Sequence, residues 1–340
     1  MKTSQEYGEW VYISPVYNLE ILDDIKGEIK IGRVHFVNIR KLPLIRKRLR
    51  LPAVLSKLGK NTANFFSESK TYTLLTFKGI PDEMVDNCRK IVEDAISILS
   101  FSQLGYCSRR NNSQFGLTKD RQVLRTYILN ADIFKGTLNA SVVSKVLPFR
   151  LDKNWYDFHK SFFFFDLLKL VSSQSKTQKK WKDTIIRASI MVGKSMQSRD
   201  LEYCFLWNMI VIEMLLTEQG DKYSESLSER AEAFLGWVGY WKEKNFKEKI
   251  NILYKKRCVF VHDGNSINIT PNDVQFTDDL VFNLLWNIVS HIKLFPSKRS
   301  IINFSEKVKA EKVLKLESSV QPKTLRFLNR EYDADNIKKI

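Results

Sequence analysis

Cysteine and histidine are scarce in this chain, which has four of each among 340 residues. The cysteines are far apart and form no Cys-x-x-Cys pair, as is typical of reduced thiols in a cytosolic protein. The histidines are equally scattered and form no His-Glu-x-x-His motif or Cys/His cluster. We therefore expect no structural or catalytic zinc and no other cofactor.

Long apolar runs and acidic residues are also in short supply. No run of about 18 uncharged apolar residues occurs, and the first ten residues, MKTSQEYGEW, lack the pattern of a signal peptide. We therefore expect a cytoplasmic protein without a membrane partner. Only 38 Asp and Glu oppose 55 Lys and Arg, giving a formal charge of +17. This excess favours a polyanionic partner, with nucleic acid ahead of a membrane surface; a merely basic, soluble surface is the alternative.

The overall composition is that of a folded protein, with 44% hydrophobic and 27% charged residues. The chain is long enough for two domains with proper cores. We predict an α+β domain over residues 1–150, an all-α helical bundle over 151–296 and a basic C-terminal extension over 297–340. The protein should be predominantly α-helical.

Short β-prone segments and one helix define the first domain. Trp10–Ile13 and Thr71–Phe77 are rich in β-branched and aromatic residues, and Ile29–Ile39 alternates between apolar and polar residues, so all three predict strands. After the breaker Gly79–Pro81, apolar residues at helical spacing predict a helix from Asp82 to about Leu99.

Residues 40–60 form a basic segment with eight basic residues and no acidic one. Leucine, isoleucine and valine are interleaved with the charges, so the segment is amphipathic. It fits either contacts to phosphates or a solvated basic face over a folded apolar one. The candidate nucleic-acid-binding residues here are Arg46, Lys47, Arg48 and Arg50.

Apolar segments predict the helices of the bundle. Tyr156–Val171, with four successive phenylalanines, predicts one buried helix, and Trp181–Met196 predicts another. Leu201–Thr217 is apolar on nearly all sides, as expected of a central helix. Ser226-x-x-Glu229 has the pattern of a capping box that opens a further helix. Asp278–Leu294 closes the bundle.

The segment Phe246–Gly264, FKEKINILYKKRCVFVHDG, carries the main candidate site. Arg257 lies in the middle of an apolar arc, where its permanent charge needs a carboxylate, a carbonyl or an anionic ligand. His262 follows directly before Asp263-Gly264, where the helix is predicted to end. At about 100° per residue, the apolar arc consists of five residues: Ile250, Leu253, Tyr254, Cys258 and Val261.

An Arg-x4-His pattern suits chemistry on a phosphodiester. Imidazole accepts and donates protons near neutral pH, and a guanidinium stabilises charge on phosphate oxygens without a metal. On spacing alone, an interface Arg in a salt bridge and a His favoured by the helix dipole is the better interpretation. Glu213, on the apolar helix, is expected to orient Arg257 or Arg230 and not to transfer protons itself.

Four motifs occur in a fixed order over about residues 155–295, under half of the chain. They are Glu213–Thr217, Leu227–Ala231 with Phe234–Gly236, Leu253–Arg257 and Val259–Gly264. In this series the chain resembles the HEPN superfamily, and within it the Apea-like HEPN group. Where many members have a polar residue directly after the Arg, this chain has Cys258.

The resemblance implies a metal-independent endoribonuclease whose active site forms where two HEPN domains meet. His262 would be the general base or acid and Arg257 would stabilise phosphate charge, while the 2′-hydroxyl attacks phosphorus to leave a 2′,3′-cyclic phosphate. A homodimer would supply both histidines. Tyr254, Lys255 and Lys256 would position RNA, although core packing or solvent exposure also explains them.

The resemblance also suggests a biological setting, because many such proteins are bacterial toxins or antiviral defence effectors. An antitoxin or activator protein is then a candidate partner, and the first domain would sense, bind an inhibitor or select substrate. Two other classes stay open. One is a non-catalytic HEPN module that binds RNA or nucleotide, or acts as a dimerisation scaffold. The other is a DNA-binding regulator, for which no helix-turn-helix signature is recognisable.

Overall fold

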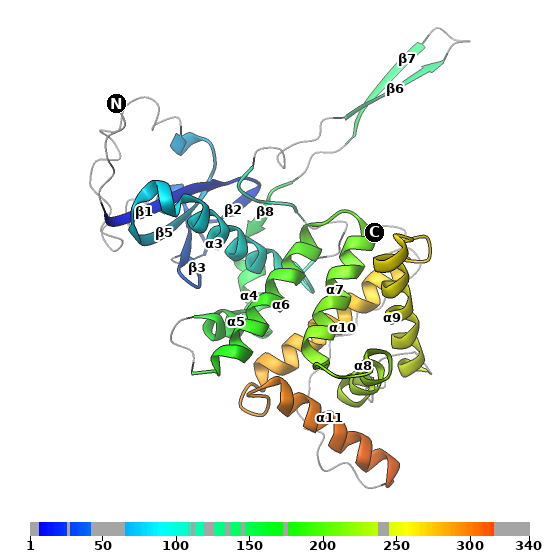
Figure 1. Cartoon of the computed structure of the whole chain (residues 1–340). Coiled ribbons are helices and arrows are strands. Elements are labelled where there is room, and N and C mark those ends of the chain that lie inside the picture. The colour runs from blue at the N-terminus through cyan, green and yellow to red at the C-terminus, as the bar shows by residue number, and fades with distance from the viewer. Residues whose placement is uncertain are drawn as a thin grey trace. The chain divides into compact units, whose positions relative to one another are not determined.

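The computed structural model of the chain (Figure 1) describes residues 7–25, 28–41, 65–107, 109, 113–118, 126–132, 137–143, 147–172, 176–236 and 245–315. The chain divides into two compact units. The N-terminal unit comprises residues 1–96 and 113–156, and the helical unit comprises residues 97–112 and 157–340. Segment 97–112, which the sequence places within the first domain, thus groups with the helices.

A four-stranded antiparallel sheet organises the N-terminal unit. Its strand order is β1 (Gly8–Val16), β5 (Thr71–Gly79), β4 (Val34–Asn38) and β3 (Ile29–Ile31). β1 and β5 pair along their whole lengths, from Gly8 opposite Gly79 to Val16 opposite Thr71. These strands confirm the three β-prone segments, and the turn at Gly32 explains why Ile29–Ile39 forms two strands.

Smaller elements complete this unit. β2 (Leu19–Ile21) pairs in parallel with β8 (Phe149–Leu151), and β6 (Thr126–Asp132) pairs antiparallel with β7 (Thr137–Val143). The predicted helix is present as α3 (Pro81–Phe101), which continues into the helical unit. Arg46, Lys47, Arg48 and Arg50 lie outside the residues that the structure describes.

The helical unit is built around one central helix, α7 (Leu201–Leu216), which contacts five other helices. These are α6 (Lys179–Gln197), α8 (Tyr223–Ala231), α9 (Phe246–Asp263), α10 (Pro271–Ser290) and α11 (Lys298–Val313). A π-helical turn, η5 (Glu232–Gly236), extends α8. The structure thus shows a mostly helical protein with a small antiparallel sheet near its N-terminus. Among the described helices, none has the length and apolarity that a membrane crossing needs.

The prediction of one helix over 156–171 is wrong. The chain forms α4 (Lys153–Ser161) and α5 (Phe164–Val171), with a break at Phe162 and Phe163. Four successive phenylalanines on one straight helix would point to all sides, because each step turns about 100°. The break lets both Phe163 and Phe164 enter the core, each 2% exposed.

The starts of two other helices also differ from the prediction. α8 begins at Tyr223, so Ser226 lies inside the helix and forms no cap. The capping box is instead at Thr270 and Asp273, whose side chains bond each other's backbone N–H groups at 3.4 and 2.9 Å. This capping box starts α10 at Pro271 and not at the predicted Asp278. Ser226 and Glu229 form no such reciprocal pair at the start of α8.

A buried ion pair ties Arg109 to the helices of the bundle. Nε and NH2 of Arg109 donate to the two carboxylate oxygens of Asp278 on α10, at 2.7 and 2.6 Å. Arg109 also donates to the carbonyl and hydroxyl of Ser195 on α6. Asn208 on α7 donates to Asp278 at 2.7 Å. The side chains of Arg109 and Asp278 are only 7% and 3% exposed, so the network fixes three helices from within.

Candidate active site

α9 positions the predicted Arg and His. It starts at Phe246 and ends at Asp263, as the sequence predicts, and Gly264 adopts the left-handed conformation, φ 66°, that ends it. Ile250 and Leu253 are buried against the bundle. The predicted apolar arc is wrong at its far end, since Val261 is 47% exposed.

The guanidinium of Arg257 binds the carboxylate of Glu213 on α7. NH2 donates to Oε2 at 3.2 Å, and Nε lies 3.1 Å from Oε1. The two helices are in contact within the helical unit (Figure 1). The side chains are 22% and 13% exposed. Arg230, the other candidate partner, instead binds Asp221 through two hydrogen bonds of 2.5 and 3.0 Å. Glu213 therefore orients Arg257.

Burial dominates the electrostatics around this pair. It raises the pKa of Glu213 above the ordinary value, although the charge of Arg257 acts in the opposite direction. It also raises the pKa of Tyr254, one turn before Arg257, and the hydrogen bond with Cys258 adds to the effect. The hydroxyl of Tyr254 is thus engaged by Cys258, one turn further along the same helix.

His262 is exposed in the last turn of α9. Five residues of α-helix separate it from Arg257, which is about 7.5 Å along the axis and about 140° around it. Arg257 therefore faces α7 while His262 points elsewhere. Within the described residues, no hydrogen bond or ion pair engages the ring of His262. One copy of the helix presents an oriented cation and an accessible imidazole on different sides.

The other three histidines are less accessible. His159 is 3% exposed, and burial lowers its pKa to about 3. His35 in the N-terminal unit lies 3.0 Å from a carboxylate oxygen of Glu28, and His291 is half-buried at the end of α10. His262 is thus the one exposed histidine among the four, all of which the structure describes.

The two lysines before Arg257 differ. Lys255 is exposed. Nζ of Lys256 donates to Asp273 at 2.7 Å, and its side chain is 21% exposed. The structure therefore brings Glu213, Tyr254 and Arg257 together, leaves Lys255 in solvent and engages Lys256 at the start of α10.

A group of partly exposed apolar residues around the last turns of α9 was missed by the sequence reasoning. Tyr203 on α7 is 49% exposed and contacts Phe260 on α9 with ring centroids 5.9 Å apart. Val259 and Val261 flank Phe260 and are 38% and 47% exposed. The signal was available: three successive apolar residues span about 200° of a helix, so they cannot all face one core. We call Tyr203, Val259, Phe260 and Val261 the apolar rim.

Within the described residues, no three His, Cys, Asp or Glu side chains are grouped so that they could hold a metal ion. A scan against protein-family models and searches of curated proteins and of solved structures found no match to the chain.

Proposed function

We propose that the chain is a metal-independent endoribonuclease of the HEPN type that acts as a homodimer. The observation that carries the proposal is the arrangement on α9, where Arg257 is oriented by Glu213 and the exposed His262 ends the same helix. This arrangement agrees with the motif series that resembles the HEPN superfamily. The basic composition, +17 overall, supports a polyanionic substrate.

Arg257 is suited to stabilise a phosphodiester in the transition state. A guanidinium has five N–H donors, and the carboxylate of Glu213 lies against only one edge of it, formed by Nε and NH2. The remaining donors of this partly exposed side chain are available to nonbridging phosphate oxygens. Because Glu213 fixes the orientation in advance, little reorganisation is needed when negative charge develops.

A second copy would supply the missing acid. In a homodimer whose subunits meet at the C-terminal end of α9, two copies of His262 would share one cleft. One imidazole would remove the proton of the 2′-hydroxyl while its oxygen attacks the adjacent phosphorus. The other would protonate the departing 5′-oxygen. The products are a 2′,3′-cyclic phosphate and a 5′-hydroxyl.

The test is incubation of total RNA in excess EDTA with the wild type, His262→Ala and the matched control His291→Gln, followed by end-group analysis. Wild type and control should produce cyclic phosphate ends, while His262→Ala should cleave about 10²–10⁴-fold more slowly, the usual contribution of a general acid or base. Equal cleavage by His262→Ala, or cleavage only without EDTA, would refute the proposed mechanism.

The apolar rim itself favours a second candidate function, a non-catalytic dimerisation scaffold. Partly exposed apolar residues clustered on two adjacent helices often mark a protein interface. In that case Arg257→Ala would impair assembly, His262→Ala would have little effect, and neither variant would change RNA. Sedimentation velocity of both variants, run beside the RNA assay, separates the two functions. If the nuclease is correct, a toxin or antiviral effector with a controlling partner protein is the setting that the resemblance implies.

A further inference from the structure

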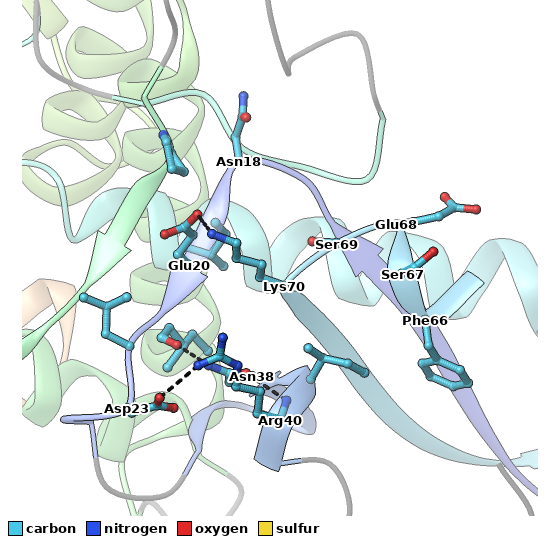
Figure 2. Close-up of a pocket in the computed structure, with 15 residues that line it drawn as sticks. Asn18, Glu20, Asp23, Asn38, Arg40, Phe66, Ser67, Glu68, Ser69 and Lys70 are labelled. Carbon is cyan, nitrogen blue, oxygen red and sulfur yellow. Dashed lines mark hydrogen bonds and ion pairs between the residues drawn. The ribbon is translucent and has the colours of Figure 1, made fainter. Parts of the chain in front are cut away.

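The N-terminal unit contains a pocket of about 820 Å³, a volume within the range of small-molecule sites, about 300–1,000 Å³. Figure 2 shows it between β2 and the ends of β4 and β5. Its lining mixes charged, amide and hydroxyl side chains with apolar surface. The apolar members of the lining are Leu19, Ile21, Leu22, Ile39, Phe66 and Pro148.

Four charged side chains of the pocket face each other across it, while a fifth, Glu68, accepts a hydrogen bond from the hydroxyl of Tyr17 and points away from them (Figure 2). Glu20 on β2 and Asp23 just after it supply carboxylates, whereas Arg40 after β4 and Lys70 before β5 supply cations. Nζ of Lys70 donates to Glu20 at 2.6 Å, and NH1 of Arg40 donates to Asp23 at 3.4 Å, so both pairs span from one wall to the other (Figure 2).

Glu20 is the least exposed of the four facing charges, since the side chain of Asp23 is 62% exposed. The side chain of Glu20 is 15% exposed and also lies 3.5 Å from Nε of Arg150. The side chains of Lys70 and Arg40 are 73% and 79% exposed. Lys70 and Arg40 therefore reach solvent and can contact a bound anion, and Arg150, 59% exposed, is a second cation close to Glu20.

Backbone contacts fix the pocket itself. Nδ2 of Asn38 donates to the carbonyl of Ile21 at 2.6 Å and joins β2 to the end of β4. Oγ of Ser69 donates to the carbonyl of Val16 at 2.6 Å and holds the segment before β5. These two hydrogen bonds hold the backbone around the pocket independently of the exposed lysine and arginine side chains.

From these four facing charges we propose that the pocket binds a phosphorylated ribose unit, as found in a free nucleotide or in an RNA strand. The phosphate would contact Lys70 and Arg40, because ammonium and guanidinium groups form strong hydrogen bonds to phosphate oxygens. Glu20 and Asp23 on the opposite wall would accept hydrogen bonds from ribose hydroxyls. The half-buried members of the apolar lining, Leu22, Ile39, Phe66 and Pro148, offer surface to the base.

Other small ligands fit the walls less well. An inorganic anion would use the cations and leave the carboxylates and the apolar lining without a role. A simple cation would have to displace Lys70 or Arg40 from carboxylates that they already neutralise. A ligand with an anionic end and several hydroxyl donors uses both walls at once.

The experiment is isothermal titration calorimetry on the full chain carrying His262→Ala, so that no RNA is cut and the result is independent of the proposed nuclease. The probes are AMP, inorganic phosphate and a short 5′-phosphorylated oligoribonucleotide. The variants are Lys70→Gln in the pocket and Lys78→Gln, an exposed lysine near the far end of the same strand, as the matched control. Circular dichroism confirms that each variant is folded.

AMP should bind saturably, about tenfold or more tightly than phosphate, and Lys70→Gln should weaken it about tenfold while Lys78→Gln changes it less than about twofold. If the oligoribonucleotide competes with AMP and shows the same loss, the natural source is an RNA strand; if it does not compete, the source is a free nucleotide. Equal binding of phosphate and AMP, equal effects of the two variants, or no saturable binding below about 1 mM would overturn the proposal.

Discussion

Two arginine–carboxylate pairs of the helical unit show how the same chemistry can serve different purposes. Arg109 and Asp278 share two hydrogen bonds of 2.6 and 2.7 Å, and their side chains are 7% and 3% exposed. Arg257 and Glu213 are joined by one hydrogen bond of 3.2 Å and a close contact of 3.1 Å, with side chains 22% and 13% exposed.

The surroundings of the two guanidinium groups differ as well. Arg109 also donates to two oxygens of Ser195, so its donors are spent inside the protein. Glu213 is the one described partner of the Arg257 guanidinium, whose side chain is 22% exposed. A buried pair whose donors are used holds a structure together, whereas an oriented pair with donors to spare can receive an anionic ligand.

The largest effect is expected from removal of the buried cation. Arg109→Met should lower the free energy of unfolding by about 3–5 kcal/mol, because Asp278 would remain as an uncompensated buried charge. Urea unfolding followed by circular dichroism measures the loss. Adding Asp278→Asn should recover part of it, since the amide carries no charge. A loss below about 1 kcal/mol would show that water reaches Asp278 and that the pair is not a structural anchor.

Arg257→Met should cost less, about 1–2 kcal/mol, because solvent reaches both partners of its ion pair. The fold should survive while RNA cleavage falls at least as far as in His262→Ala. A double-mutant cycle with Glu213→Gln measures the coupling energy of the pair. A coupling energy as large as that between Arg109 and Asp278 would contradict the proposed difference between the two pairs. It would favour a purely structural role for Arg257.

The distinction between the two pairs was only partly accessible from the sequence. The limits of α9 followed from apolar spacing and from Asp263-Gly264, and the need of Arg257 for a carboxylate followed from its place on an apolar arc. The choice between Arg257 and Arg230 as the partner of Glu213 is a matter of helix packing, which periodicity does not encode. Glu213 was named because a carboxylate on so apolar a helix needs a partner.

Arg109 shows what sequence reasoning missed. It lies in a polar stretch that predicts a loop, and nothing local indicates that its side chain is buried against α10, 169 residues further on. The same limit applies to the break at Phe162 and to the start of α10. In each case a tertiary contact or a reciprocal side-chain bond outweighs the local pattern.

The pH dependence of the free energy of unfolding should have opposite signs for two carboxylates, Glu213 and Asp221, because their pKa values shift in opposite directions. Burial raises the pKa of Glu213, so the folded state holds a proton at pH values where the unfolded chain has lost it. The stability of the wild type relative to Glu213→Gln should therefore fall as the pH rises from 4.5 through the raised value.

Asp221 provides the opposite case, because its hydrogen bonds with Arg230 lower its pKa below 3.8. Its contribution to stability is fully present above that pH and is lost as the pH falls through the lowered value. Relative to Asp221→Asn, the wild type should thus gain stability as the pH rises. Unfolding curves of both variants and the wild type between about pH 3 and 7 measure the slopes. Slopes of the same sign would contradict the contrast.

The smallest effect concerns the lysines beside Arg257. Lys255→Gln should change the free energy of unfolding by less than about 0.5 kcal/mol, because this side chain is exposed, yet it should reduce the salt dependence of RNA binding by about one unit of slope. Lys256→Gln is the matched control. Its ion pair with Asp273 should make it the more destabilising change, by about 0.5–1 kcal/mol, with little effect on the slope. If both variants lower the slope equally, the ion pair of Lys256 with Asp273 opens when RNA binds. The contrast between a structural cation and a ligand-binding cation would then not hold for Lys256 and Lys255.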